Sequence, residues 1–94
     1  MMTYRLAFLP SAEKEWRKLG ETLRKQFKAK LTKRLQAPRV PGDALHGMSD
    51  CYKIKLRQAG YRLVYRVEDN VLTVVVVAVG KRERGEVYAE AKRR

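Results

Sequence analysis

Five basic residues stand in an alternating pattern that suits the binding of a polyanion and chemistry upon it. They are Lys53, Lys55 and Arg57 in one short segment, and Arg62 and Arg66 in the next. In a β-strand alternate residues share one face and lie about 6.5 Å apart. Residues 51–67 contain no acid, so these charges would repel one another unless a polyanion lay across them. We therefore expect all five to project from the same side of one β-hairpin.

Three further residues of chemical interest follow the last apolar run of the sequence. Lys81 and Arg82 come directly after Gly80, where this run ends, and Tyr88 follows six residues after Arg82. A central strand beside the hairpin would deliver Lys81 and Arg82 to the edge of the basic face. A final helix over residues 82–94 would place Tyr88 about two turns from its start.

The composition favours one class of partner and excludes several kinds of metal and catalytic site. The net charge is +12, from 22 basic and 10 acidic residues, which favours a nucleic acid over an acidic protein or an anionic membrane as partner. One cysteine, Cys51, excludes a disulfide framework and a cysteine-based zinc finger, and one histidine, His46, excludes a histidine pair. Glu83, Glu86 and Glu90 fit a solvated helix face better than a metal site. We expect no metal and no cofactor.

The elements that hold these residues can be read from periodicity and turn residues. We expect strands over residues 4–8, 51–57, 61–67 and 71–79, the last being apolar on both faces and so buried on both sides. A first helix begins after the N-cap Ser11 and ends at Gly20, and a second spans residues 21–36. The order β-α-α-β-β-β-α predicts an α+β fold with a mostly antiparallel four-stranded sheet and helices packed on it.

Length and hydropathy predict one cytoplasmic domain. The 94 residues suffice for a single domain, which we assign to residues 1–94. No apolar run approaches the roughly 18 residues of a membrane span. The first residues lack the pattern of a signal peptide.

Four segments, in the same order over nearly the whole chain, resemble the RelE-type toxins of bacterial and archaeal toxin–antitoxin systems. They are Lys-Glu-Trp-Arg-Lys-Leu-Gly (14–20), Cys-Tyr-Lys-Ile-Lys-Leu-Arg (51–57), Gly-Tyr-Arg-Leu-Val-Tyr (60–65), and Gly-Lys-Arg-Glu-Arg (80–84) followed by Val-Tyr (87–88). The resemblance implies a small microbial-RNase-like domain and a ribosome-dependent endoribonuclease that cleaves mRNA in the ribosomal A site. It also implies neutralisation by a RelB-type antitoxin.

The resemblance carries over five catalytic residues: Lys53, Lys55, Arg62, Arg82 and Tyr88. We assign Lys55 or Tyr88 as general base, Lys53 as a contact to the 2′-hydroxyl or phosphate, and Arg62 as a transition-state clamp. Arg82 would be a clamp or the acid for the leaving group. Attack by the 2′-hydroxyl would leave a 2′,3′-cyclic phosphate. A wider surface for mRNA and 16S rRNA would comprise Arg57, Arg66, Lys81, Arg84, Lys25, Lys28 and Lys33.

Two other functions use the same basic face: a non-catalytic RNA- or ribosome-binding module, and a protein whose basic groove only holds an acidic partner segment. The last helix bears on control. It is short and has few large apolar residues besides Val87 and Tyr88, so we expect it to dock weakly. An antitoxin would then either cover the basic hairpin or displace this helix.

Overall fold

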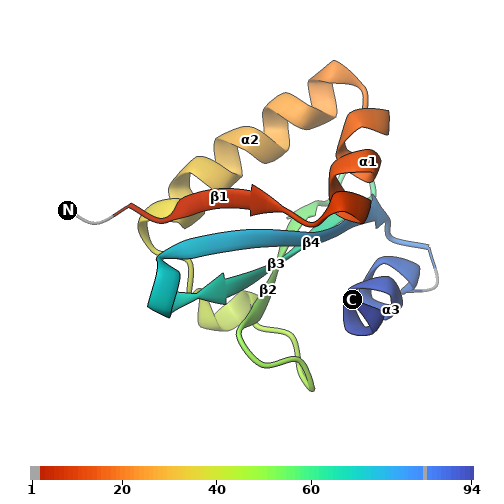
Figure 1. Cartoon of the computed structure of the whole chain (residues 1–94). Coiled ribbons are helices and arrows are strands. Elements are labelled where there is room, and N and C mark those ends of the chain that lie inside the picture. Colours follow the sequence, from red (N-terminus) through yellow and green to blue (C-terminus); the bar gives the residue numbers. More distant parts are fainter. Residues whose placement is uncertain (1–2, 84) are drawn as a thin grey trace.

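Four strands and three helices make up the part of the chain that the computed structural model describes, residues 3–83 and 85–94 (Figure 1). The strands are β1 (Arg5–Phe8), β2 (Cys51–Leu56), β3 (Tyr61–Glu68) and β4 (Thr73–Lys81). The helices are α1 (Pro10–Lys18), α2 (Glu21–Gln36) and α3 (Glu86–Arg93), and short 3₁₀ turns lie at Pro41–Asp43 and Asp69–Val71. The expected order of elements is confirmed.

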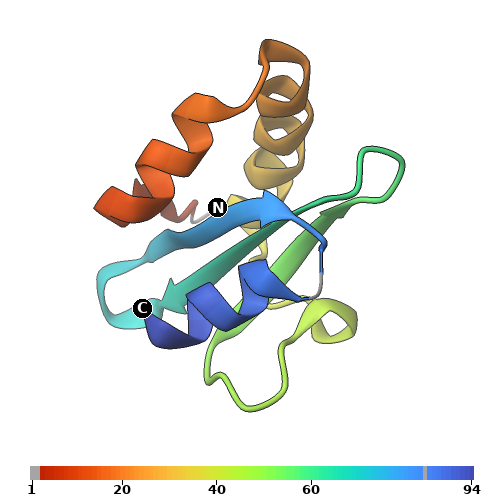
Figure 2. The ribbon, with the colours of Figure 1, turned by 90° about the vertical axis from the view of Figure 1, so that its right-hand side faces the viewer.

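The strands form one sheet in the order β1-β4-β3-β2. β1 pairs with β4 in parallel, while β4 with β3 and β3 with β2 are antiparallel, so the mostly antiparallel sheet is also confirmed. Helices α1 and α2 cover one face and α3 covers the other (Figure 2). β4 is therefore sandwiched, and its residues from Val74 to Val79 are buried, as its apolar character on both faces predicts.

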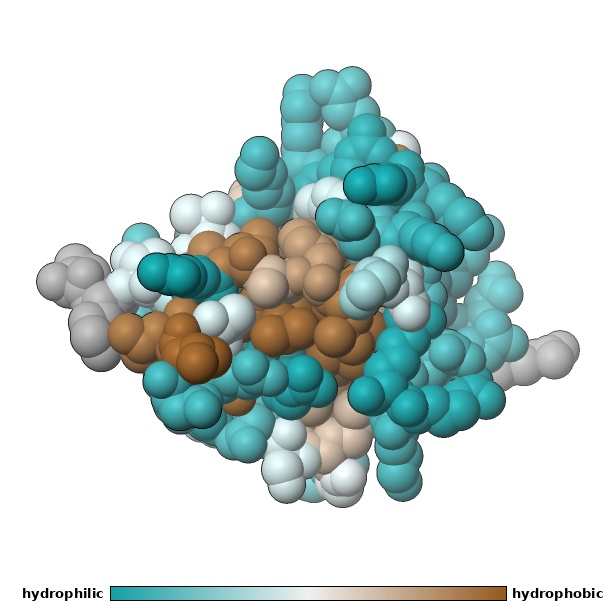
Figure 3. Space-filling view, in the orientation of Figure 1, coloured by the Kyte–Doolittle hydropathy of each residue, from teal (hydrophilic) through white to brown (hydrophobic). Residues whose placement is uncertain are grey.

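Each face of the sheet has its own apolar cluster. The larger joins the inward side chains of the strands to α1 and α2, and its fully buried members include Phe27, Leu31, Leu63, Tyr65 and Val76. The smaller lies under α3 and contains Cys51, Val64, Val77, Ala78, Val87 and Ala91. On the side of the molecule where β1 forms the sheet edge, apolar side chains also reach the surface among hydrophilic ones (Figure 3). Leu6 of β1 is an exposed apolar residue.

The first helix begins differently from the expectation. The helix starts at Pro10 with Leu9 as its N-cap, so the predicted N-cap Ser11 lies inside the first turn. Proline suits the first helical position because its fixed φ is already helical and its missing N–H would have no partner there.

The last helix is shorter than predicted. It begins at Glu86 rather than at residue 82, because Gly85 takes a left-handed conformation with φ 68° at the N-cap. Tyr88 consequently lies in the first turn of α3, not about two turns into it. β4 also differs: it begins at Thr73 rather than Val71, since Leu72 has φ 47°, and it continues to Lys81. No helix in residues 3–83 and 85–94 is long and apolar enough to cross a membrane.

Candidate active site

The register of the β2–β3 hairpin fixes which basic residues are neighbours. Lys55 lies opposite Arg62, Lys53 opposite Val64, and Cys51 opposite Arg66. Directly opposed residues point to the same face of a sheet. Val64 belongs to the cluster under α3, so Lys53, Lys55, Arg62 and Arg66 project to the α3 side while Ile54 and Leu63 enter the larger core. The shared basic face is thus present in the structure.

A cavity of about 430 Å³ opens on this face. Its lining consists of Lys53, Lys55, Arg57, Arg62, Arg82 and Tyr88. The five residues carried over as catalytic therefore meet in one place, together with Arg57, although they come from β2, β3, the segment after β4, and α3.

Backbone contacts bring Arg82 and Tyr88 to the hairpin. The Arg82 N–H donates to the carbonyl of Gly60 in the β2–β3 turn, with an N···O distance of 2.7 Å. Three residues later, the left-handed Gly85 turns the chain into α3 and places Tyr88 one turn along. Glycine adopts this conformation without steric cost, so the bend between Arg82 and Tyr88 is built into the sequence.

Arg62 is the most deeply placed cation of the cavity. Its exposed fraction is 5%, and its Nη1 donates to the carbonyl of Tyr61 at 2.9 Å. Among the described residues no carboxylate forms an ion pair with it. A buried positive charge without a counter-ion is costly to the free protein. The charge of Arg62 is therefore available to an incoming phosphate.

The surrounding cations change the acidity of Lys55. Its ammonium pKa is lowered from the usual value, first by the charge of Arg57 and then by burial, with smaller effects from Lys53 and Arg62. The carboxylate of Asp43 acts in the opposite direction. A lower pKa means that the neutral amine, which can accept a proton, is more populated near neutral pH. Lys55 is thus disposed to act as a base.

The α3 helix is held by more than its apolar contacts. Arg94 donates from Nη1 and Nη2 to the two carboxylate oxygens of Glu15, at 2.9 and 3.0 Å, and from Nη1 to the carbonyl of Val77 at 2.9 Å. The same carboxylate is also fixed to β4, because its Oε1 accepts the Val79 N–H at 3.0 Å. We call this ion pair the Arg94–Glu15 clamp. The prediction that α3 docks weakly considered only its apolar residues and did not include the clamp.

The clamp occupies a particular position on the sheet. β1 pairs with β4 only as far as Phe8, opposite Val76, so beyond that point the edge of β4 has no strand partner. Arg94 and Glu15 take over the Val77 carbonyl and the Val79 N–H there. One ion pair therefore completes the sheet edge and joins α3 to α1.

Other residues expected to contact RNA do not line this cavity. Arg66 pairs with Glu68 at 3.0 Å, and Lys81 is exposed outside the lining. Lys25 and Lys28 face a second cavity beside Trp16, whereas Lys33 faces a third, along β2. Arg84 lies outside the described residues. No group of three or more metal-ligating side chains occurs in the described part of the chain.

Three charged residues that lie beside β2 were not identified from the sequence. Arg34 and Asp43 form an ion pair at 2.6 Å beside β2, and Lys30 projects near them from α2. The pair joins the end of α2 to the 3₁₀ turn Pro41–Asp43, for which the sequence has no periodic signal. Lys30 could have been found, because it lies one turn before the predicted contact Lys33 on the same side of the helix.

Known toxins resemble this chain over nearly its whole length. The sequence matches the family model described as the ParE toxin of type II toxin–antitoxin systems over residues 6–85. It is 58% identical over 93 residues to the mRNA interferase toxin RelE of Escherichia coli K12, covering 99% of this chain and 98% of the relative. The mRNA interferase RelE of Shigella flexneri matches with the same identity and coverage.

Solved structures of E. coli RelE share the fold. The free state of a double-arginine mutant superposes with a TM-score of 0.91 at 55% identity, covering 98% of this chain and 97% of that one. RelE in the intact E. coli RelBE toxin–antitoxin complex superposes with a TM-score of 0.83 at 57% identity, covering 86% and 99%. The chain belongs to the ParE toxin family of type II toxin–antitoxin systems, as a RelE-type member.

Proposed function

We propose that this chain is a cytoplasmic toxin that cleaves mRNA in the ribosomal A site and so inhibits translation. Its activity is that of a metal-independent endoribonuclease in one domain. Three facts support this: family membership, the high identity to proteins named mRNA interferases, and the cavity lined by five cations and a tyrosine. The cavity is the observation that carries the proposal, because its residues fit each step of phosphodiester cleavage.

The first step removes a proton from the 2′-hydroxyl of the nucleotide before the scissile bond. None of the residues lining the cavity is a histidine or a carboxylate, so the base must be a lysine or the tyrosine. The lowered pKa of Lys55 supports Lys55 in this role, with Tyr88 as the alternative. Lys53, one pleat away on the same face, contacts the 2′-hydroxyl or the phosphate.

The second step forms the bond from the 2′-oxygen to phosphorus and breaks the bond from phosphorus to the 5′-oxygen. Negative charge builds on the phosphorane oxygens, and preorganised donors stabilise it. The side chain of Arg62 is nearly buried and is held by its hydrogen bond to the Tyr61 carbonyl. It is therefore suited to stabilise the negative charge of the phosphorane. Arg82 binds the same group or gives a proton to the departing 5′-oxygen. The product ends in a 2′,3′-cyclic phosphate.

Dependence on the ribosome follows from what the cavity lacks. All but one of its charged residues are exposed or only half-buried, and no aromatic side chain other than Tyr88 lines it. Such a site stabilises charge well but orients a flexible RNA strand poorly. A ribosome that presents the codon in a fixed conformation would supply the missing orientation, which can contribute several orders of magnitude in rate.

The cleavage activity would be controlled by an inhibitory partner protein. Solved structures contain E. coli RelE with the antitoxin RelB and with a peptide from it. We extend this to the present chain and propose a RelB-type antitoxin as its inhibitor. The net charge of +12 would favour an acidic or amphipathic segment of such a partner.

Primer extension on mRNA from programmed ribosomes tests the proposal. The purified protein should produce a stop within the A-site codon, and much less cleavage should occur on the same mRNA without ribosomes. Arg82→Ala is the companion variant: it should still associate with ribosomes but cut poorly. Intact mRNA with the unaltered protein bound to ribosomes would instead indicate a binding module.

A further inference from the structure

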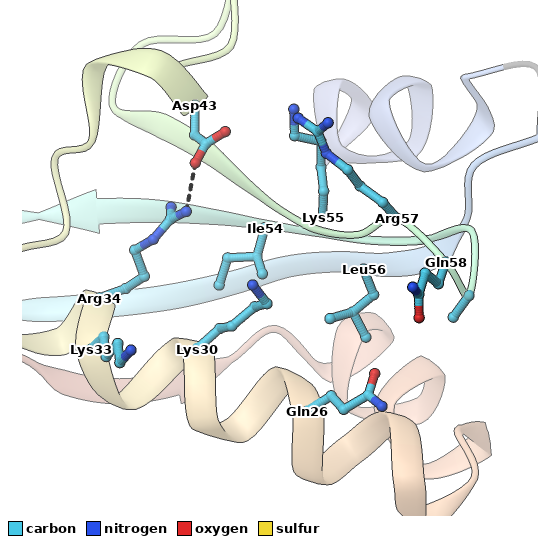
Figure 4. Close-up of a pocket in the computed structure, with 11 residues that line it drawn as sticks. Gln26, Lys30, Lys33, Arg34, Asp43, Ile54, Lys55, Leu56, Arg57 and Gln58 are labelled. Carbon is cyan, nitrogen blue, oxygen red and sulfur yellow. Dashed lines mark hydrogen bonds and ion pairs between the residues drawn. The ribbon is translucent and has the colours of Figure 1, made fainter.

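The cavity along β2 is larger than the candidate active site. It measures about 680 Å³ and runs along the outer edge of β2, between that strand and α2 (Figure 4). Lys30 rises from α2 toward β2, whereas Lys55 and Arg57 rise from the strand on the opposite side of Ile54 and Leu56 (Figure 4). We call this cavity the β2 groove, with Lys30, Lys33, Arg34, Asp43, Lys55 and Arg57 as its charged lining.

The β2 groove is continuous with the candidate active site. Lys55 and Arg57 line both cavities. This is possible because β2 is the outermost strand, so no further strand separates the α3 side of the sheet from the α2 side. A chain-like ligand bound beside Arg62 and Arg82 can therefore extend over Lys55 and Arg57 into the groove, because no strand lies in between.

The charge of the groove is strongly positive after its one acid is counted. Asp43 lies 2.6 Å from Arg34, with both side chains mostly buried, so this pair contributes little net charge. Lys30, Lys33, Lys55 and Arg57 form no ion pair with any described residue. Four cations thus line a groove in which no acid is left over.

The cations of α2 do not form one uniform basic surface. Residues five positions apart on an α-helix are rotated by about 140°. Lys25 and Lys28 accordingly face the cavity beside Trp16, while Lys30 and Lys33 face the β2 groove. Lys25 is moreover paired with Glu21 at 3.4 Å. Two lysines of the helix without an ion pair among the described residues, Lys30 and Lys33, are thus directed toward the strand that carries Lys55, while Lys28 lies on the other side of the helix.

We propose that the β2 groove is a second RNA subsite, in which Lys30 and Lys33 bind backbone phosphates of the nucleotides that flank the scissile bond in the mRNA. The inference rests on the proposed function and adds to it the path of the substrate strand. A single-stranded RNA carries one negative charge per nucleotide on either side of the cleaved phosphate. A basic groove that leaves the reaction site is the feature that follows such a backbone.

Charge-neutralising variants test the subsite. Lys30→Ala/Lys33→Ala removes two exposed lysines and keeps good helix formers, so the fold should persist. Lys14→Ala/Lys18→Ala on α1 is the charge-matched control, since both lysines are exposed and line none of the three cavities. The first measurement is binding of a short single-stranded RNA against salt concentration. Removing two phosphate contacts should reduce the slope of log K against log salt by about 1.4, at about 0.7 per contact.

The second measurement is cleavage on programmed ribosomes. The groove variant should show a several-fold higher KM, with a single-turnover rate at saturation close to that of the unaltered protein, whereas the control should change little in either. A methylphosphonate linkage in the mRNA, which removes one phosphate charge, identifies the source of the contact. Placed at a flanking position, it should weaken the unaltered protein but have little further effect on the groove variant.

Each contrary result has its own meaning. Equal losses in the groove and control variants would replace the subsite by a general effect of net charge. Additive losses from the methylphosphonate and the groove variant would assign the lysines to ribosomal RNA and overturn the mRNA path. If the unaltered protein does not cut, the proposed function fails, and the salt slope on the oligonucleotide still decides whether the groove binds RNA.

Discussion

Substituting Arg94 with alanine should release α3 and slow cleavage, although Arg94 itself does not line the cavity. Arg94 makes two charge-assisted hydrogen bonds to Glu15 and one to the Val77 carbonyl. The side chains of Arg94 and Glu15 are 17% and 29% exposed, so solvent weakens these bonds only in part. Hydrogen bonds to charged groups contribute about 1.5–3 kcal/mol each, and discounting for shared and exposed groups leaves about 2–3 kcal/mol for α3 docking.

This loss is large for so short a helix. Since about 1.4 kcal/mol is a factor of ten, the docking equilibrium should fall about 30- to 150-fold. Apart from the clamp, α3 is docked mainly by Val87 and Ala91, with Tyr88 partly buried beside them. The undocked helix carries Tyr88 out of the cavity, so the single-turnover cleavage rate should fall with the docked fraction.

Two measurements and one matched variant check this. Amide exchange of residues 86–93 should quicken in Arg94→Ala, and single-turnover cleavage on ribosomes should slow in parallel. Arg93→Ala removes the same charge one position earlier, but Arg93 is 69% exposed and bonds only to Glu90 of its own helix, so it should resemble the unaltered protein. Equal exchange in both variants would refute the clamp. Fast exchange with undiminished cleavage would refute the role of α3 in catalysis.

Four further predictions follow from the site. Arg82→Ala should lower single-turnover cleavage about 10²–10³-fold with ribosome association nearly unchanged, and near-normal cleavage would remove Arg82 from the reaction. Arg57 is the largest cause of the lowered pKa of Lys55, so Arg57→Gln should raise that pKa and move the ascending limb of the pH–rate profile to higher pH; an unmoved limb would favour Tyr88 as base. Cleavage of a preassembled complex with magnesium held constant should survive chelation of other metals, and rescue by a specific transition metal would contradict this. A RelB-type antitoxin should change the amide exchange of residues 82–94, whereas protection of residues 51–66 alone would indicate that it covers the basic face without displacing α3.

The hairpin was predictable because a strand has one simple rule. Alternation fixes which side chains share a face, and a register slip would have buried several cations. The structure accordingly brings Lys53, Lys55 and Arg62 together as their spacing predicts. The bounds of α2 were also predictable, since an apolar stripe of helical period lies between Gly20 and the loop containing Pro38.

What could not be predicted depends on contacts between distant residues or on single backbone angles. Arg94 and Glu15 are 79 positions apart, and nothing in either segment indicates the other. The start of α3 depends on the left-handed angle at Gly85, which a helix propensity summed over residues 82–94 does not detect. The α2 lysines could not be assigned to two different cavities from the sequence, because this assignment depends on where β2 lies relative to the helix.

The most direct test of the central account is cleavage of an mRNA that carries a 2′-deoxynucleotide immediately before the scissile bond, in the A site of a programmed ribosome. The account requires the 2′-hydroxyl as nucleophile, so the deoxy substrate should remain intact while the all-ribose control is cut to a fragment ending in a 2′,3′-cyclic phosphate. Cleavage of the deoxy substrate at a rate similar to that of the control would contradict the account, because the attacking group would then have to be water or a side chain of the protein.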